Sequence, residues 1–166
     1  TSLNVQRVLS TVPTVAQNEQ LVNPHDSAQS LDDRARSYLH ANCAMCHRPG
    51  GSAIASFFLR RDISFDELKT NKGTGIGTFG MHDSKVIAAG DPYRSVLMYR
   101  MSKLGYSRMP YIGTRVVDSE GVSLISDWIQ SMPIENEDRD LASSPLLKTS
   151  TEVKALARLS REQTAD

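Results

Sequence analysis

Cys43, Cys46 and His47 stand together in the segment Cys43-Ala44-Met45-Cys46-His47, the part of the chain best equipped for chemistry. Its two thiols are separated by one turn of backbone, and the histidine directly follows the second thiol. This C-x-x-C-H spacing is the pattern of c-type haem attachment. Two such thiols add across the two vinyl groups of a haem, and the adjacent imidazole then lies under the iron. The segment predicts one covalently attached haem c, with His47 as an iron ligand.

Other chemistries use cysteines at this spacing. A thioredoxin-type dithiol follows a strand in a βαβ unit, whereas here a helical pattern precedes Cys43 and Pro49-Gly50-Gly51 follows the motif. The chain has only two cysteines, too few for an all-cysteine zinc or iron–sulfur site. They are also too close together to form a disulfide framework. Dithiol redox chemistry, a Cys₂His metal site and a chance match are the alternatives to haem.

An iron held by one histidine needs a second axial ligand, and methionine is the usual one in cytochromes c. Met109 lies in an expected loop between two helices and is braced by Pro110, so we predict that it is the second ligand. His82, which follows a glycine-rich loop, is the main alternative. The other methionines and histidines lie in expected helices, between the thiols or in less favourable segments: Met45, Met81, Met98, Met101, Met132, His25 and His40.

Four helices are expected to position these residues. Ser30 and Asp33 form a capping box at the start of a helix that runs into Cys43. A last helix is expected over 119–132, where apolar residues recur at helical spacing. Two further helices are expected over 65–70 and 93–103, behind the capping patterns of Ser64 with Glu67 and of Asp91-Pro92.

Residues 71–80 contain four glycines and are expected to form a loop. The segment lacks the Gly-Lys-Ser/Thr ending and the preceding strand of a phosphate-binding loop. A compact domain rarely keeps such long loops unless something else fills its interior. The expected fold is therefore an all-α helical domain around one covalent haem, with long loops.

The composition is that of a globular protein, with 39% hydrophobic and 23% charged residues. No apolar run reaches the roughly 18 residues that a transmembrane helix needs. The 166 residues are expected to divide into an N-terminal arm (1–28), a monohaem domain (29–133) and a C-terminal extension (134–166) with a linker and a weak helix over 150–161. The formal net charge is zero, and we expect no nucleic-acid partner.

The order of parts resembles a class I cytochrome c domain, with a first helix that ends in the haem motif, a loop methionine and an aromatic-bearing last helix. In finer detail the chain is similar to cytochrome domains found at the ends of large multidomain bacterial secreted proteins. The likeness covers about residues 28–133 and is carried by 38–43, 90–95, 108–110 and 127–129.

The resemblance implies a cytochrome c-like fold in which the first and last helices cross beside the haem. It implies one-electron transfer in the periplasm or another extracytoplasmic location. The partner is expected to be a redox protein or an adjoining catalytic domain of a larger protein. The alternative function is a haem enzyme or a gas or redox sensor with an open or displaceable distal site.

One feature departs from the class I pattern. These domains usually carry a proline about a dozen residues after the haem histidine, and here Phe57-Phe58-Leu59-Arg60 occupies that neighbourhood. A backbone carbonyl within 57–61 is the expected acceptor for the Nδ1–H of His47. Because arginine pairs well with carboxylates, Arg60, Arg61 and Arg108 are the candidate partners of the haem propionates.

Overall fold

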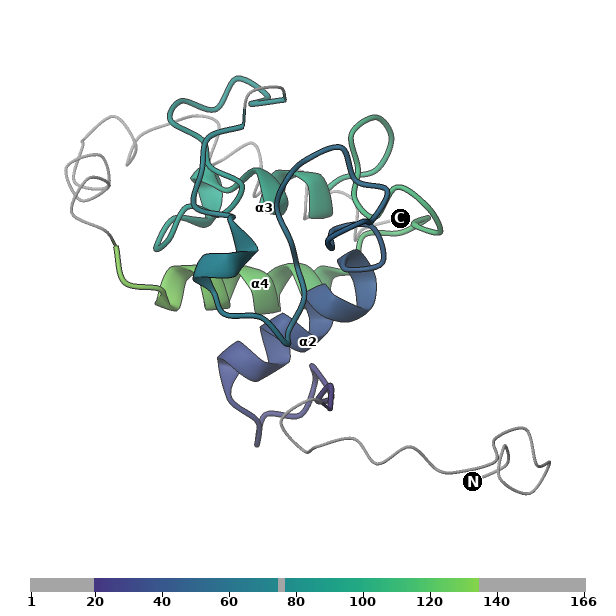
Figure 1. The fold of residues 1–166 in the computed structure, drawn as a ribbon, viewed down its shortest axis with the longest axis vertical. Helices are drawn as coiled ribbons and strands as arrows, with labels where there is room; N and C mark the ends of the chain where they lie inside the picture. Colours follow the sequence, from purple (N-terminus) through teal and green to yellow (C-terminus); the bar gives the residue numbers. More distant parts are fainter. Residues whose placement is uncertain (1–19, 75–76, 135–166) are drawn as a thin grey trace.

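The computed structural model describes residues 20–74 and 77–134, and every regular element in these ranges is helical. Two isolated backbone bridges, Gly73–Lys85 and Lys85–Ser95, do not extend into strands. The all-helical class predicted from the sequence is therefore confirmed for this part of the chain (Figure 1). None of the described helices is long and apolar enough to cross a bilayer.

Helix α2 spans Leu31–Cys43 and begins where its capping residues predict. The hydroxyl of Ser30 accepts the backbone N–H of Asp33 at 3.1 Å and donates to the Asp33 carboxylate at 2.8 Å. The helix ends at Cys43, so the reactive segment continues directly from its last turn. Its buried face consists of Ala35, Ser37, Tyr38 and Leu39.

Helix α4 spans Ser119–Ser131, in agreement with the predicted range to within one residue. Asp118 caps it through its side chain, which accepts the backbone N–H of Gly121 at 3.0 Å. Of the apolar stripe that the helical spacing predicts, Ile125, Trp128 and Ile129 are buried, whereas Met132 follows the last helical residue and is only partly buried. Gly121 and Leu124 complete the buried face.

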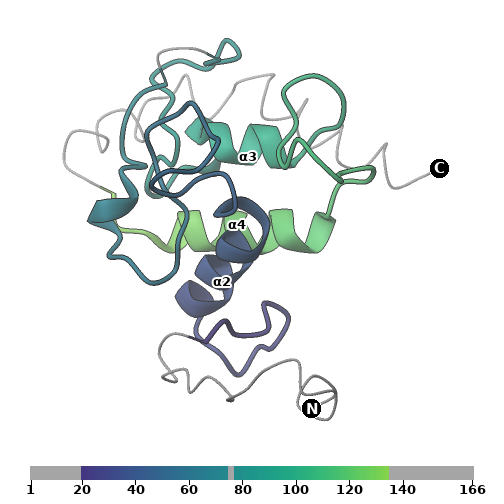
Figure 2. The same ribbon diagram turned by 45° about the vertical axis from the view of Figure 1, so that its right-hand side comes forward.

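Helices α2 and α4 cross and pack against each other (Figures 1 and 2). The Tyr38 ring fills the space where Gly121 has no side chain, since a Cβ there would lie 2.3 Å from the ring atom Cζ. The Tyr38 hydroxyl donates to the Asp118 carboxylate at 2.9 Å. A second hydrogen bond joins the helices where the indole Nε1–H of Trp128 donates to Asp32 at 2.8 Å.

The two middle helices are shorter than predicted. The capping bonds between Ser64 and Glu67 form, but they start only a single 3₁₀ turn, η2 (Asp66–Leu68), because Lys69 takes a left-handed conformation with φ 57°.

The helix predicted over 93–103 is divided at Ser95 into η3 (Pro92–Arg94) and α3 (Val96–Met101). Ser95 is extended and buried, and its hydroxyl donates to the Asp91 carbonyl at 2.9 Å and accepts the Ala88 N–H. These bonds of the hydroxyl hold Ser95 in its extended conformation, which interrupts the helix.

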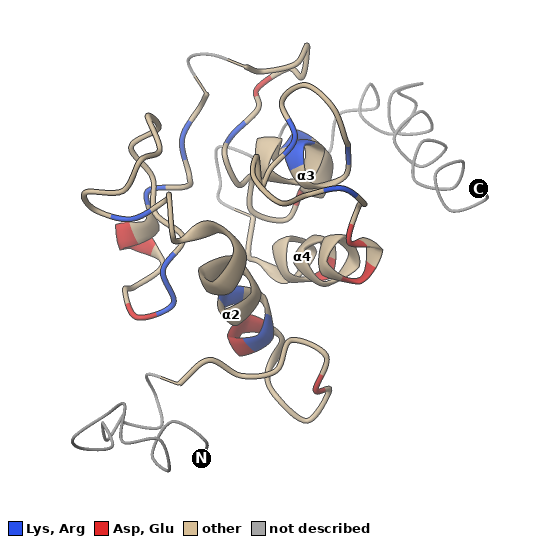
Figure 3. Ribbon diagram, turned by 90° about the vertical axis from the view of Figure 1, so that its right-hand side faces the viewer, with Lys and Arg blue, Asp and Glu red and all other residues tan. Residues whose placement is uncertain are grey.

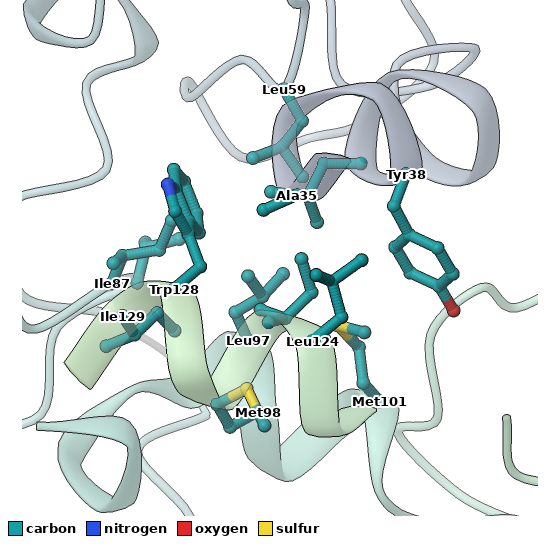
Figure 4. Close-up of a cluster of buried hydrophobic side chains, with 13 residues drawn as sticks. Ala35, Tyr38, Leu59, Ile87, Leu97, Met98, Met101, Leu124, Trp128 and Ile129 are labelled. Carbon is teal, nitrogen blue, oxygen red and sulfur yellow. The ribbon is translucent and has the colours of Figure 1, made fainter. Parts of the chain in front are cut away.

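The core lies where α2, α3 and α4 meet (Figure 4). Leu39, Ile125 and Ile129 are almost wholly buried there. The segment after the glycine-rich loop also enters the core, because Val86 and Ile87 donate backbone hydrogen bonds to residues 72 and 70. Val86, Ile87 and Ala88 are buried there, although no helical pattern in the sequence marks them as core residues.

The end of the N-terminal arm lies against α2. The N–H of Val22 donates to the Ser37 hydroxyl at 3.0 Å, and Arg34 donates to the Pro24 carbonyl at 2.7 Å. Residues 1–19 of the predicted arm lie outside the described residues, as do 135–166 of the predicted C-terminal extension and its weak helix over 150–161.

Substitution of Gly121 tests the crossing of α2 and α4. Gly121→Ala should lower the free energy of unfolding by about 1–3 kcal/mol, because the added methyl overlaps the Tyr38 ring. Helix propensity alone predicts the opposite sign. The control is Ser123→Ala on the exposed face of α4, expected to change stability by no more than about 0.5 kcal/mol. Denaturant unfolding followed by circular dichroism measures both, and a stabilised Gly121→Ala chain would contradict the packing.

Candidate functional site

The reactive segment is built as a continuation of α2. The carbonyl of Cys43 accepts hydrogen bonds from the N–H groups of Cys46, at 3.1 Å, and His47, at 2.9 Å. The chain then folds back over the segment, because a Cβ on Gly51 would lie 2.1 Å from the Cys46 carbonyl oxygen. The Ala53 N–H donates to that same carbonyl at 3.3 Å. The structure thus brings Cys43, Cys46 and His47 together in one folded turn.

Both cysteines are free thiols and partly buried. Burial raises the pKa of the Cys43 thiol to about 12, and the neighbouring Cys46 adds to the effect. A thiol in such surroundings remains protonated near neutral pH and is a poor nucleophile. This environment does not resemble the activated thiolate of a dithiol oxidoreductase.

One ring nitrogen of His47, Nδ1, is buried. It lies without a well-formed hydrogen bond, and among the described residues no side-chain hydrogen bond to the ring occurs. Burial lowers the pKa of His47; the nearby Phe57 backbone opposes this shift, and the positive charge of Arg100 adds to it. The Phe57 ring stacks on the imidazole, with centroids 4.3 Å apart and planes at 18°.

Phe57 belongs to the 57–61 stretch from which a carbonyl acceptor for His47 Nδ1–H is expected, and it lies against the imidazole, but Nδ1 has no hydrogen-bond partner among the described residues and the acceptor stays a prediction. The chain on either side is also fixed, because the Leu59 N–H donates to the His47 carbonyl at 2.9 Å. Leu59 is buried in the core. The imidazole is therefore held between the end of α2 and a loop anchored in the hydrophobic interior.

Met109 lies half-buried on the loop between α3 and α4. Its N–H donates to the carbonyl of Arg100 at 2.9 Å, which ties the loop back to α3. The Thr114 hydroxyl closes the loop further by donating to the Pro110 carbonyl at 2.8 Å. The Arg100 backbone thus holds Met109, and the charge of the Arg100 side chain contributes to the lowered pKa of His47. Arg100 is therefore common to the loop of Met109 and the turn of His47.

The other predicted ligands are less suitably placed. The His82 side chain is 89% exposed and pairs with Asp83, while Nδ1 of His40 accepts the Arg61 N–H at 3.1 Å. His25 pairs with Glu120 at 3.1 Å on the surface. Among the methionines, Met98 and Met101 are buried in the core, Met132 packs against its edge, Met45 is 67% exposed and Met81 is partly buried in a loop.

The three arginines predicted to face propionates all have protein partners. Arg60 pairs with Asp62, and Arg61 pairs with Asp33 at 2.6 Å. Arg108 donates to the carbonyls of residues 105 and 111. Arg100, which the sequence analysis did not select, is the arginine whose charge reaches His47. No local sequence signal distinguishes it, because its position depends on how α3 packs.

Within the described residues, no three His, Cys, Asp or Glu side chains converge as they would around a bound metal ion. No protein-family model, curated protein or solved structure matches the chain.

Alkylation tests the environment of the Cys43 thiol. In the haem-free chain at pH 8.5, Cys43 should react with iodoacetamide at least about tenfold more slowly in buffer than in denaturant, because the raised pKa lowers the thiolate fraction. The folded chain also holds the thiol proton more tightly than the unfolded chain does. Its stability should therefore be unaffected below the thiol's ordinary pKa and should fall as the pH rises from there toward 12. Peptide mass spectrometry measures the modification. Equal rates with and without denaturant would show that the thiol is not buried as described.

Proposed function

We propose that this chain is a c-type cytochrome module that transfers single electrons through one covalently bound haem. Cys43 and Cys46 would hold the haem through thioether links, and His47 and Met109 would bind its iron. The observation that carries the proposal is the folded turn at the end of α2, which presents two free thiols beside an imidazole held by burial and stacking. A redox-active haem iron supplies the electron storage, and the protein supplies its ligands and surroundings.

The thiols fit the attachment chemistry. In each link a cysteine sulfur would bond to one vinyl carbon and the thiol hydrogen would go to the other, so the chemistry would need no external oxidant or leaving group. The low nucleophilicity of the buried Cys43 thiol agrees with a reaction that needs maturation machinery in the cell. The same property argues against spontaneous thiol exchange as the role of this pair.

The surroundings of His47 fit an iron ligand. A metal binds an imidazole in the plane of its ring, so the Phe57 ring stacked on its face leaves the coordinating edge clear. With Nδ1 buried toward the protein, Nε2 is the nitrogen available for the iron. The Phe57 backbone beside Nδ1 is the natural acceptor that would orient the ring once it is bound.

Met109 fits the second ligand because its side chain belongs to neither a helix face nor the hydrophobic core. Its backbone is fixed to Arg100, so the side chain is presented from a tethered loop. A thioether ligand favours reduced iron and raises the reduction potential, as suits a carrier. The crossing of the first and last helices also agrees with the class I cytochrome arrangement that we propose for the fold.

A haem enzyme or sensor would need polar groups free to act at the distal side. Both terminal nitrogens of the Arg108 guanidinium donate to backbone carbonyls, and His82 is largely exposed beside Asp83. These contacts favour a carrier over a catalyst. In line with the resemblance to class I cytochromes, we propose that the chain works in the periplasm or another extracytoplasmic compartment, with a redox protein or an adjoining catalytic domain as its partner.

Covalent attachment is tested by mass. Expressed in cells that mature c-type cytochromes, the full chain should retain the mass of one haem after denaturation and solvent extraction. Cys43→Ala with Cys46→Ala should abolish the added mass, whereas Met45→Leu, which alters only the exposed residue between the thiols, should keep it. A wild-type mass equal to that of the bare chain would refute the proposal.

The ligand assignment is tested by replacing Met109 with alanine. The variant should lose the far-red methionine–iron charge-transfer band and bind carbon monoxide rapidly when reduced, because the sixth position is open. Met81→Ala, at another partly buried loop methionine, is the matched control and should behave as wild type. An unchanged band in Met109→Ala, or its absence from the wild type, would instead favour His82.

A further inference from the structure

A hollow of about 860 Å³ lies near the N-terminal half of α2 and the C-terminal end of α4. Asp32, which lines it, precedes Cys43 by eleven residues, or about 16 Å along the helix. None of the four residues that we propose to bind the haem lines the hollow. It is therefore separate from the proposed redox site, and an inference about it does not depend on the haem.

The wall of the hollow is partly aromatic and carries more positive than negative charge. Phe65 and Trp128 supply the aromatic surface. Three cationic and two anionic side chains line it, a net charge of +1: Arg36, Lys69, Lys72, Asp32 and Asp66. Asp32 is already engaged, because it accepts the indole N–H of Trp128. The basic groups are thus only partly balanced.

Lys69 and Lys72 are the basic groups best placed to receive a carboxylate. The Lys72 ammonium donates to the Ser56 carbonyl and hydroxyl, at 2.8 and 2.9 Å, which leaves a third donor. The Lys69 ammonium lies 5.6 Å from the centroid of the Phe58 ring. Neither lysine has an ion-pair partner among the described side chains. Both follow η2 closely in the chain, and Figure 3 shows acidic and basic segments close together beside α2.

The wall also holds unmet hydrogen-bonding capacity. Thr70 is 1% exposed and its hydroxyl has no partner, and the Nε of Arg36 is likewise buried and unpaired. Buried polar groups nearly always have partners in folded proteins. Two buried groups that can still accept or donate a hydrogen bond therefore lie behind one hollow.

The chain leaves the described body at this hollow. Ile134, the last described residue, lines it and packs on Gly90, where a Cβ would be 2.4 Å from an Ile134 side-chain carbon. The N–H of Gly90 donates to the Ile129 carbonyl at 2.9 Å, which fixes this contact to α4. The next six residues are Glu135-Asn136-Glu137-Asp138-Arg139-Asp140, with four carboxylates and one arginine, a net charge of −3.

We propose that this acidic segment, residues 135–140, docks on the hollow through ion pairs to Lys69 and Lys72. Fully extended, six residues span about 20 Å, ample to reach both lysines from the rim. Covalent connection gives a short segment an effective concentration in the millimolar range, so weak ion pairs suffice to hold it.

Lysine footprinting on the full chain tests this docking. Neutralising the segment (Glu135→Gln, Glu137→Gln, Asp138→Asn and Asp140→Asn together) should raise the acylation rates of Lys69 and Lys72 by about two- to fivefold, because exposed ion pairs are individually weak. Lys103, which contacts Tyr99 on α3, should not change. The matched control neutralises acidic residues farther along the chain (Glu152→Gln, Glu162→Gln and Asp166→Asn) and should leave both lysines protected. Peptide mass spectrometry reads these rates whether or not haem is bound.

A reciprocal experiment examines the segment itself. Lys69→Gln with Lys72→Gln should increase the rate of cleavage after Glu135 and Glu137 by a glutamate-specific protease, while Lys103→Gln should not. Unchanged lysine reactivity in the neutralised segment, together with unchanged cleavage in the double-lysine variant, would overturn the docking. Protection that rises with protein concentration would also overturn it, since the occupant would then be a second copy of the chain.

Discussion

The contact between Tyr38 and Gly121 fixes how α2 and α4 cross, and the rest of the domain depends on that crossing. The ring occupies the volume that any side chain at 121 would need. Its hydroxyl bonds Asp118, the residue that also caps α4. One carboxylate therefore starts the helix and attaches it to its neighbour. Because Cys43 is five residues beyond Tyr38 on the same helix, the crossing also determines where the reactive turn emerges.

The two halves of the candidate site are positioned by different means. The Cys43–His47 turn extends α2 through hydrogen bonds to the Cys43 carbonyl, whereas Met109 is attached to α3 through the Arg100 carbonyl. Helices α2 and α3 each pack on α4, so α4 is the common support of both halves. A haem bound as we propose would join them directly, since it would bond to the turn through two sulfurs and to the loop through its iron. Attachment and folding of the domain would then reinforce each other.

Capping residues predict where helices α2 and α4 begin, whereas contacts between distant segments determine where the predicted middle helix is broken. Ser30 and Asp118 form their caps because the interacting groups lie within one turn of each other. The break at Ser95 depends instead on bonds to residues 88 and 91 outside α3. The assignment of Arg60 and Arg61 to haem propionates stays a prediction. Both arginines pair with carboxylates of the chain, Asp62 and Asp33, and closeness to a motif in sequence does not indicate such pairs. The reactive turn was recognisable because its chemistry requires adjacent residues, while Arg100 approaches His47 only through packing.

The two ends of helix α2 have different roles: its first turns fasten the helix to the fold, and its last turn leads into the reactive segment. In its first turns, Asp32 bonds Trp128, Asp33 pairs with Arg61, and Arg36 donates to carbonyls of the 60–63 loop. These bonds fasten the helix to α4 and to the loop beside it. At the other end, the two thiols are free and the His47 ring has no hydrogen-bonded side-chain partner among the described residues. The thiols and the imidazole are thus held in position by a helix that other bonds fasten, and none of them is engaged in a disulfide or a side-chain hydrogen bond within the described part of the chain. A site that binds a cofactor needs side chains that are both positioned and unengaged.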